Sequence, residues 1–453
     1  MTERLDNDAV LERALDEVKR RDSIAAEAYL RDSQGTSIEV IDGKVESAEV
    51  ETERGIGIRV LEAGRVGFAY TSDLSPSGIT ECVDLAVANA RVTSPDESIA
   101  FAASPLPLNG EAELRIFDPS YETHDVVEKT ELCLEIEAAA KRTDPRITSF
   151  YKTSYGDGVG ATVFATTTGA YGTYRSTSFG GGTACVATEG DDKQIGGFGD
   201  GGRTFGSIDA ARIGEEAARR AVEKLRARPF KTQRIDIVLE PYRAMELVGA
   251  ISSLFSAENV LKGKSLLAGK IDQRVASDLV TLRDEGRQIG GRATSPFDGE
   301  GTPTQDLYLL RGGVLRGYLQ SIKTANRLRA APTGNARRGS YAGTPHAGIS
   351  NFYIVAGATA AKDLVRGADR ALALTSLLNL HTIDPISGEF SLGATATYLE
   401  RGELQYPVKG ITIAGNLIAL LTAIAAVGDD LRFGSSGVGS PTLLVRDISV
   451  GGE

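Results

Sequence analysis

Fifty-two glycines in 453 residues constrain the fold of this chain more than any other feature of its sequence. They follow no Gly-X-Y period, so they do not indicate a collagen-like fibre. Glycine adopts the backbone conformations that tight turns require, and frequent tight turns favour β-hairpins. The densest stretch, residues 148–195, mixes glycines with Val, Thr, Tyr and Phe, which predicts strands. We therefore expect a protein rich in hairpins.

Helical patterns lie mainly in the first half of the chain. Apolar residues recur at helical spacing in four stretches there: 8–21, 77–90, 125–142 and 208–227. Two-residue hairpin signals occur at Asp42-Gly43 and Ala63-Gly64. We expect this half to be an α/β region with antiparallel strands and helices.

The second half reads mostly as strands and turns. It follows a polar seam near residue 230 and ends with an apolar run, residues 415–427, which predicts a buried helix. The overall prediction is an α+β protein. Its expected domains are an N-terminal α/β domain, residues 1–230, and a β-rich, barrel- or sandwich-like C-terminal domain, residues 231–453.

Charge and cysteine content exclude several classes of protein. Lys and Arg total 50 against 61 Asp and Glu, a net charge of −11, which disfavours direct binding to nucleic acid or an anionic membrane. Cys82, Cys133 and Cys185 are widely spaced and odd in number, so no disulfide framework is expected. The charged N-terminus lacks the apolar core of a signal peptide, and no apolar run approaches the ~20 residues of a membrane span. We expect a cytoplasmic protein.

Familiar catalytic motifs are weak or missing. His124, His346 and His381 are the three histidines, and no two lie within five residues of each other, so the paired histidines of a helical zinc site are absent. Residues 197–202 (GFGDGG) match the dinucleotide pattern GxGxxG before a predicted helix, but no clear βαβ unit surrounds them. In a chain so rich in glycine, such a match is expected by chance.

The most unusual polar segment is residues 332–341 (PTGNARRGSY), preceded by residues 298–305 (DGEGTPTQ). Arginines of this segment can clamp a carboxylate, and neighbouring amides and hydroxyls can bond a peptide backbone. The alternative is a glycine-rich loop whose polar groups satisfy one another. The candidate substrate-binding residues are Thr304, Gln305, Asn335, Arg337, Arg338 and Tyr341.

These segments resemble the TldD/PmbA family, whose members were once labelled modulators of DNA gyrase. The matching stretches also include GISNFY (348–353), FSLGATATYLERGE (390–403), YPVKGITIAGN (406–416) and SPTLLVRDISVGG (440–452). The resemblance implies a zinc protease that combines a TldD-like catalytic chain with a TldE-like partner and acts on unfolded or peptide substrates.

In that family the catalytic chain carries HExxxH and a later cysteine ligand. Aligned from Lys262 onward, this window falls on VGAISS, from Val248 to Ser253, and no cysteine follows Cys185. The resemblance therefore implies a PmbA/TldE-like chain without catalytic residues or metal ligands of its own. Zinc is expected in a TldD-like, HExxxH-bearing partner.

Three functions remain open at this stage. The preferred one is a non-catalytic subunit of a TldD/TldE-type metalloprotease, forming a heterodimer with its partner or a homodimer when alone. The second is a stand-alone peptidase with an unrecognised site near Asp298, Arg337, Arg338 and Tyr341. The third is a regulatory binding protein of the gyrase-modulator type.

Overall fold

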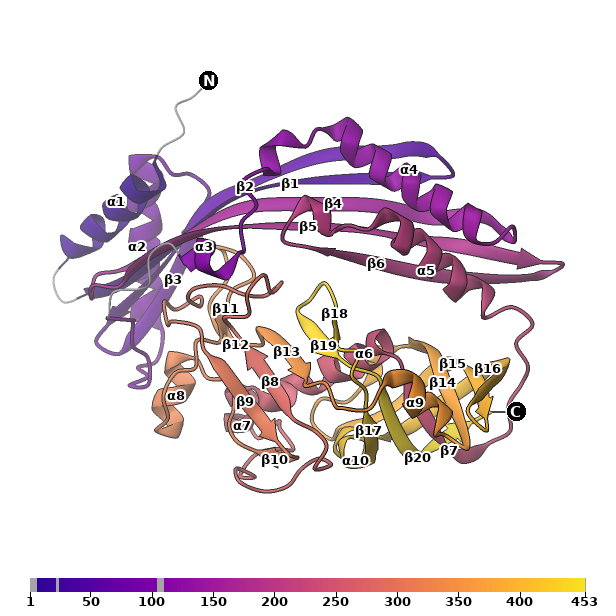
Figure 1. The fold of residues 1–453 in the computed structure, drawn as a ribbon. Coiled ribbons are helices and arrows are strands. Elements are labelled where there is room, and N and C mark those ends of the chain that lie inside the picture. Colours follow the sequence, from indigo (N-terminus) through magenta and orange to yellow (C-terminus); the bar gives the residue numbers. More distant parts are fainter. Residues whose placement is uncertain (1–5, 22–23, 104–109, 453) are drawn as a thin grey trace.

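The computed structural model describes residues 6–21, 24–103 and 110–452. Six antiparallel strands of the first half form a long sheet in the order β3-β2-β1-β4-β5-β6 (Figure 1). Their bounds are β1 Ile24–Ile41, β2 Lys44–Glu62, β3 Arg65–Thr71, β4 Ile147–Thr166, β5 Tyr171–Glu189 and β6 Asp192–Gly202. Both predicted hairpin turns are confirmed, because Asp42-Gly43 and Ala63-Gly64 connect paired strands with positive φ at all four residues.

Four helices cover one face of the long sheet (Figure 1). They are α1 Asn7–Lys19, α2 Pro76–Val92, α4 Val126–Thr143 and α5 Ala210–Val222, with a short α3 at Gly110–Leu114. Apolar residues of α1 and α2 pack on one end of the sheet, beside Ala26, Ala28 and Leu30 of β1. Those of α4 and α5 pack on the other end, beside Ile38 and Val40. Even-numbered positions of β1 therefore face the helices, and its odd-numbered positions face the second half.

The second half contains a closed barrel. Its sheet has the order β16-β15-β14-β7-β20-β17, and β16 also pairs with β20, which closes a ring of five strands. The strands are β7 Gln233–Leu239, β14 Arg370–Leu378, β15 Glu389–Glu400, β16 Glu403–Asn416, β17 Ile424–Val427 and β20 Leu443–Gly451. The predicted α+β class with a barrel-like C-terminal part is thus confirmed.

A second six-stranded sheet, β10-β9-β8-β13-β19-β18, lies beside the barrel and shares its apolar core. Its strands are β8 Leu282–Glu285, β9 Asp306–Arg311, β10 Val314–Leu315, β13 Asn351–Ile354, β18 Arg432–Phe433 and β19 Val438–Ser440. A small ribbon pairs β11 Ala336–Arg337 with β12 His346–Ala347. The helices of this half are α6 Pro241–Ile251, α7 Ala257–Leu261, α8 Ile322–Leu328, α9 Ala361–Arg366 and α10 Leu417–Thr422.

One sequence interpretation is wrong. The helix expected at residues 415–427 is only α10, because the side chain of Asn416 caps its start and the chain then enters β17, which pairs with β20. Strand pairing overrides the apolar helical pattern there. The GxGxxG residues, 197–202, belong to β6 and pair with β5, so they form no phosphate-binding loop. Within the described residues, no helix combines the length and apolar character needed to cross a membrane.

Candidate functional site

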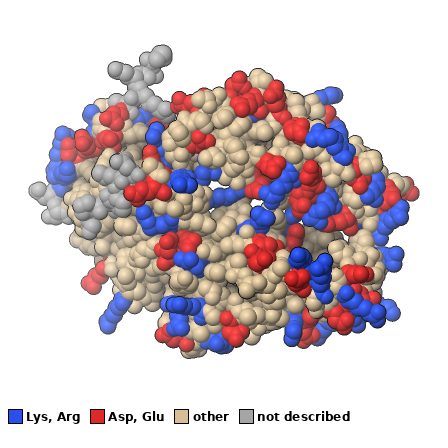
Figure 2. All heavy atoms as spheres, viewed as in Figure 1, with Lys and Arg blue, Asp and Glu red and all other residues tan. Residues whose placement is uncertain are grey.

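A chamber of about 910 Å³ lies over the middle of the long sheet, and Arg292 of the second half lines it. An adjoining cavity of about 650 Å³ shares five lining residues with it, among them Gly156, Ser178 and Arg203. Figure 2 shows the surface hollowed between the two halves, with basic and acidic side chains around the opening. The chamber is therefore formed where the two halves of the chain face each other.

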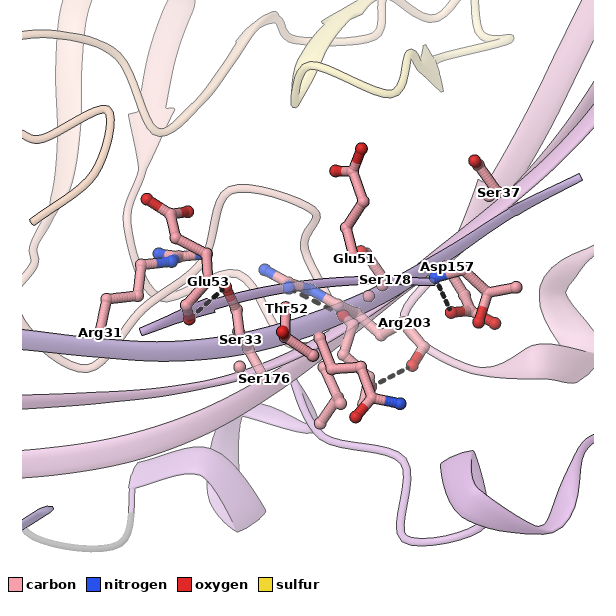
Figure 3. A pocket seen from close by; sticks show the side chains of 18 of the residues that line it. Arg31, Ser33, Ser37, Glu51, Thr52, Glu53, Asp157, Ser176, Ser178 and Arg203 are labelled. Carbon is pink, nitrogen blue, oxygen red and sulfur yellow. Dashed lines mark hydrogen bonds between the residues drawn. The ribbon is translucent and has the colours of Figure 1, made fainter. Parts of the chain in front are cut away.

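On β1, β4 and β5 the floor of the chamber consists of serine and glycine, and β2 adds Glu51 and Glu53 beside it. In three successive rungs, β1, β4 and β5 place these residues opposite one another: Ser33, Gly160 and Ser176; Gly35, Gly158 and Ser178; Ser37, Gly156 and Gly180. We call these nine residues the serine–glycine floor, part of which is visible in Figure 3. A Cβ at Gly156 would meet nothing within 4 Å, so the floor leaves open space above it.

A buried ion pair supports the floor from the helix side. Asp157 pairs with Thr36 across the strands, and its carboxylate lies 2.6 Å from the Lys129 Nζ of α4. The hydroxyls of Tyr121 and Tyr155 donate to the same carboxylate at 2.8 and 2.7 Å. Burial tends to raise the pKa of Asp157, but the hydrogen bonds from Lys129 and the two tyrosines lower it overall. These contacts anchor a glycine-rich stretch that has few side chains of its own.

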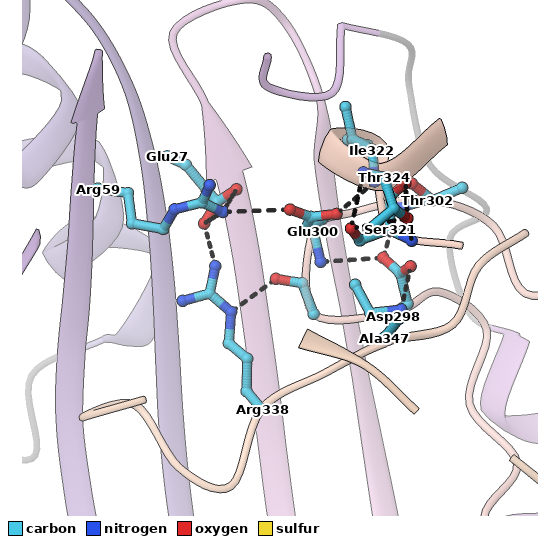
Figure 4. Close-up of polar contacts among 12 residues, drawn as sticks. Glu27, Arg59, Asp298, Glu300, Thr302, Ser321, Ile322, Thr324, Arg338 and Ala347 are labelled. Atoms are coloured by element: carbon cyan, nitrogen blue, oxygen red, sulfur yellow. Dashed lines mark hydrogen bonds and ion pairs between the residues drawn. The ribbon is translucent and has the colours of Figure 1, made fainter. Parts of the chain in front are cut away.

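At one end of the sheet, four charged side chains connect the two halves (Figure 4). Arg59 of β2 lies 3.2 Å from Glu27 of β1 and 3.5 Å from Glu300 of the second half. Arg338 of the second half pairs with Glu27 and donates to the Gly299 carbonyl at 2.7 Å. We call Glu27, Arg59, Glu300 and Arg338 the ionic latch; all four are more than nine-tenths buried.

Asp298 and Glu300 are held by backbone donors beside the latch. Asp298 accepts from the amides of Glu300, Thr302 and Ala336, each at 2.9 Å. Glu300 accepts from the Ile322 amide at 2.8 Å. Burial raises the pKa of Asp298 to about 6 and that of Glu300 to about 7. The motif at residues 298–305 therefore contributes buried acidic groups to the junction between the halves.

The predicted binding residues occupy different environments. Thr304 is buried and its hydroxyl donates to the Ser295 carbonyl, while the amide of Gln305 donates to the Pro332 carbonyl at 3.0 Å. Asn335 is 1% exposed and donates to Asp284 at 2.6 Å. Polar groups of the loop thus satisfy one another at these three positions, as the alternative interpretation expects.

Tyr341 and the two arginines reach toward the long sheet. The Tyr341 ring packs against Gly55 of β2 and its backbone carbonyl against Gly57, where a Cβ would meet these atoms at 2.3 and 2.1 Å. Arg338 is committed to Glu27 in the ionic latch. Arg337 instead donates to the Ser350 hydroxyl from Nη2, and its buried Nε has no hydrogen-bond partner among the described residues. Among the six candidates, Arg337 therefore retains unused donor capacity.

The structure adds functional candidates that sequence reasoning missed. Arg31 of β1, Tyr174 of β5 and Arg203, which follows β6, line a pocket of about 180 Å³ together with Arg337 and Arg338. Arg31 and Arg203 also line the chamber. Each stands alone in a strand-like segment, so no motif marked them, and only the strand pairing brings them together.

The window aligned with HExxxH spans the end of α6 and the 3₁₀ turn Ser252–Phe255. Val248 is 3% exposed and belongs to the large core of the second half, as does Ile251. The Ser253 carbonyl accepts from the amide of Asn259 at 2.8 Å. In the described part of the chain, no three His, Cys, Asp or Glu side chains are grouped to hold a metal ion.

Comparison with known proteins connects these features to one family. Three family profiles match consecutive parts of the chain: PmbA/TldA metallopeptidase domain 1 at residues 26–90, the central domain at 119–225 and the C-terminal domain at 232–452. Metalloprotease PmbA of Escherichia coli O157:H7 is 28% identical over 95% of this chain and 93% of its own length. A Haemophilus influenzae metalloprotease TldD homolog is 27% identical over 94% and 92%.

Solved structures show the same fold. A Thermotoga maritima protein described as a proposed modulator of a DNA gyrase superposes with a TM-score of 0.89 at 24% identity, covering 98% of this chain and 99% of its own. TldE from Thermococcus kodakarensis superposes with a TM-score of 0.84 at 20% identity, covering 98% and 100%. The long sheet, its helices and the barrel are thus a shared architecture.

Proposed function

The chain belongs to the PmbA/TldD metallopeptidase family, and we propose that it is the peptide-binding, non-catalytic subunit of a two-chain zinc metalloprotease, of the PmbA/TldE type. The observation that carries this proposal is the donor set at the end of α6. Where the family resemblance aligns two histidines and a glutamate, this chain has Val248, Gly249 and Ser253. The role of this chain is then to hold substrate for a partner that carries the metal.

The residues present do not fit a catalytic zinc ion. Such a site uses about three protein ligands, mostly His, Cys or carboxylate, and a base that activates bound water. Val248 packs in the apolar core and Gly249 has no side chain. His124 stacks on Phe205 in the first half, far along the chain from α6. We therefore derive no step of peptide hydrolysis through a metal on this chain.

The chamber supports peptide binding. Its volume lies within the roughly 300–1,000 Å³ range of ligand sites, and the nine residues of its serine–glycine floor have no side chain larger than that of serine. Glycines let a main chain approach closely, and serine hydroxyls donate or accept hydrogen bonds with any peptide group. A surface of this composition contacts backbone rather than particular side chains, which suits substrates of varied sequence.

The proposed partner is a TldD-like chain that carries HExxxH and zinc. A subunit that only binds peptide contributes to turnover when its chamber is continuous with the partner's metal site. We therefore propose a heterodimer as the working form, and a two-fold homodimer when the chain is alone, since closed two-fold symmetry is the commonest arrangement of identical chains.

Reconstitution tests the proposed function. This chain and an HExxxH-bearing relative are purified separately and together, and each sample is assayed for zinc content, for mass by light scattering and for hydrolysis of unstructured peptides. We expect well under one zinc per chain and no hydrolysis for this chain alone, with activity appearing in the mixed complex. One tightly bound zinc per chain, hydrolysis by this chain alone, or strictly monomeric behaviour with and without the partner would overturn the proposal.

A further inference from the structure

We call the 180 Å³ pocket at the end of the serine–glycine floor the arginine pocket. More arginines line this pocket than form ion pairs with carboxylates. Arg31, Arg203, Arg337 and Arg338 line it, and Asp298 is its one lining carboxylate. Within the described ranges only Arg338 has a carboxylate partner within ion-pair distance, Glu27. Three guanidinium groups thus face this pocket without an ion pair.

The three arginines differ in what they can still bind. Arg203 donates to the carbonyls of Thr177, Gly291, Arg292 and Thr294 at 2.6–3.1 Å, so it supplies charge rather than free donors. The Nη2 of Arg31 lies 3.8 Å from the position of a Cβ on floor residue Gly160. Arg337 uses one nitrogen for Ser350 and has a free Nε. Arg31 and Arg337 therefore retain N–H donors.

Nearby acidic groups leave this donor capacity available. Asp298 lines the pocket, but both its oxygens already accept backbone N–H groups. Asp284, behind the pocket, accepts from Asn335 and from the Ser350 amide. Glu53 interacts with Arg31 over a longer distance from the exposed rim of β2, where solvent weakens the attraction (Figure 3). Asp284 and Asp298 attract Arg337 electrostatically, and burial lowers the pKa of Arg203 to about 10.

From this arrangement we infer that the arginine pocket binds a peptide carboxylate, with Arg31 and Arg337 as donors and Arg203 as a fixed positive charge. The pocket shares Arg31, Ser176 and Arg203 with the chamber, so a peptide lying on the floor can place one carboxylate in it. Arginine's planar fork matches a carboxylate in two-point contacts. Phe297 and the rings of Tyr29 and Tyr174 provide apolar surface for the residue that carries it.

This inference rests on the proposed function for its substrate class, a peptide, but it is tested by binding rather than hydrolysis. Two sources supply the carboxylate: the C-terminus of the peptide or an acidic side chain. The probes are N-acetylated hexapeptides of Gly, Ala and Leu at pH 7.5. One pair differs only as C-terminal acid or amide, and a second, amidated pair carries Glu or Gln at its third position. Calorimetry measures affinity for this chain alone and for the two-chain complex.

We expect about tenfold tighter binding of the carboxylate form in one of the two pairs, the pair identifying the source. In Arg31→Gln and Arg337→Gln the ratio between the two forms falls toward one. The control Arg20→Gln, on the exposed arginine that follows α1, keeps the wild-type ratio. Because the ratio compares two ligands on one protein, a partly unfolded variant does not distort it.

Equal affinities within both pairs, or ratios that persist in Arg31→Gln and Arg337→Gln, would overturn the inference. These outcomes are independent of the zinc and activity measurements that test the proposed function. A chain that hydrolyses peptides by itself can still show the carboxylate preference, and a non-catalytic subunit can lack it. The two proposals therefore fail separately.

Discussion

The face of the long sheet that meets the second half has two regions with opposite compositions. At one end, the ionic latch fills the interface with four buried charged side chains. A few rungs along the same strands, the serine–glycine floor has only glycine and small serine side chains and faces open space. On β1 the two regions are separated only by Tyr29 and Arg31. The ionic latch joins the two halves of the chain by ion pairs, whereas the serine–glycine floor leaves a cavity between them.

This difference separates stability from binding along a single strand. A buried charge network leaves little freedom, since breaking it exposes an uncompensated charge to a low-dielectric interior. A floor of glycine and serine contributes little packing energy of its own. The Asp157–Lys129 ion pair, on the helix side of the sheet, stabilises these strands instead. Substitutions in the ionic latch should therefore lower the free energy of unfolding, whereas substitutions in the serine–glycine floor should lower the affinity for ligand.

The largest effect is expected for Arg338→Met in the latch. The substitution removes one of the two guanidinium groups that pair with the buried Glu27 carboxylate and leaves Arg59 as the other. Losing one member of a buried ion pair costs about 3–5 kcal/mol of unfolding free energy. Denaturant unfolding measures this loss, and Arg20→Met, at the exposed C-cap of α1, serves as control, with a change below about 0.5 kcal/mol. The double variant Glu27→Gln/Arg338→Met should lose less than the two single variants combined. If the losses of unfolding free energy in the two single variants simply add up to the loss in the double variant, Glu27 and Arg338 do not interact as the ionic latch requires.

A smaller effect on stability but a clear one on function is expected for Arg337→Ala. Charge-assisted contacts contribute roughly 1.5–3 kcal/mol each, so peptide turnover by the two-chain complex should fall about tenfold to a hundredfold while assembly is retained. Melting temperature, partner affinity and turnover are measured on the same variant. A joint loss of melting temperature and partner binding would indicate a structural role for Arg337, and wild-type turnover in an intact complex would exclude a substrate contact.

Filling the floor should affect binding without unfolding. Gly156→Leu places a side chain in open space, since no atom lies within 4 Å of its Cβ position. We expect peptide affinity to fall about tenfold, equivalent to about 1.4 kcal/mol, with a melting temperature close to wild type. Gly156→Ala fills less of the chamber, so its peptide affinity should lie between those of the wild type and Gly156→Leu. If both variants bind peptide as tightly as the wild type does, peptide does not bind on the serine–glycine floor.

Local patterns predicted the elements of both regions but not their roles. The segment at residues 148–195 is strand-forming, as predicted, yet glycines 156, 158 and 160 lie within β4 rather than at turns. Their importance depends on the register between β1 and β4, which brings residues more than 100 positions apart onto one rung. Pairing of distant strands cannot be read from a single sequence window.

The binding residues show the same limit. Asn335, Arg337 and Arg338 were identifiable because the loop at 332–341 is unusually polar, but their partners are distant in sequence. Arg338 pairs with Glu27, 311 positions away. Arg31 and Arg203 carry no motif, so a sequence pattern could not join them to Arg337. Apolar patterns failed once, at residues 415–427, where pairing with β20 converts the end of the predicted helix to a strand.

The last expected effect is a pH dependence of the latch that the floor should not share. Burial raises the pKa of Glu300 from its ordinary 4.5 to about 7, so the folded chain binds this proton more tightly than the unfolded chain. The resulting stabilisation is complete below pH 4.5 and is lost as the pH rises through 7.

Glu300→Gln, which cannot ionise, removes this dependence. We expect the melting temperature of the wild type, relative to Glu300→Gln, to decline by a few degrees between pH 5 and pH 8. Glu135→Gln, on an exposed glutamate of α4, should follow the wild type throughout. Asp298, with a pKa raised to about 6, is present in both proteins, and its charge contributes to the raised pKa of Glu300. A difference that stays constant with pH would mean that Glu300 remains ionised in the latch, held by Arg59 despite its burial.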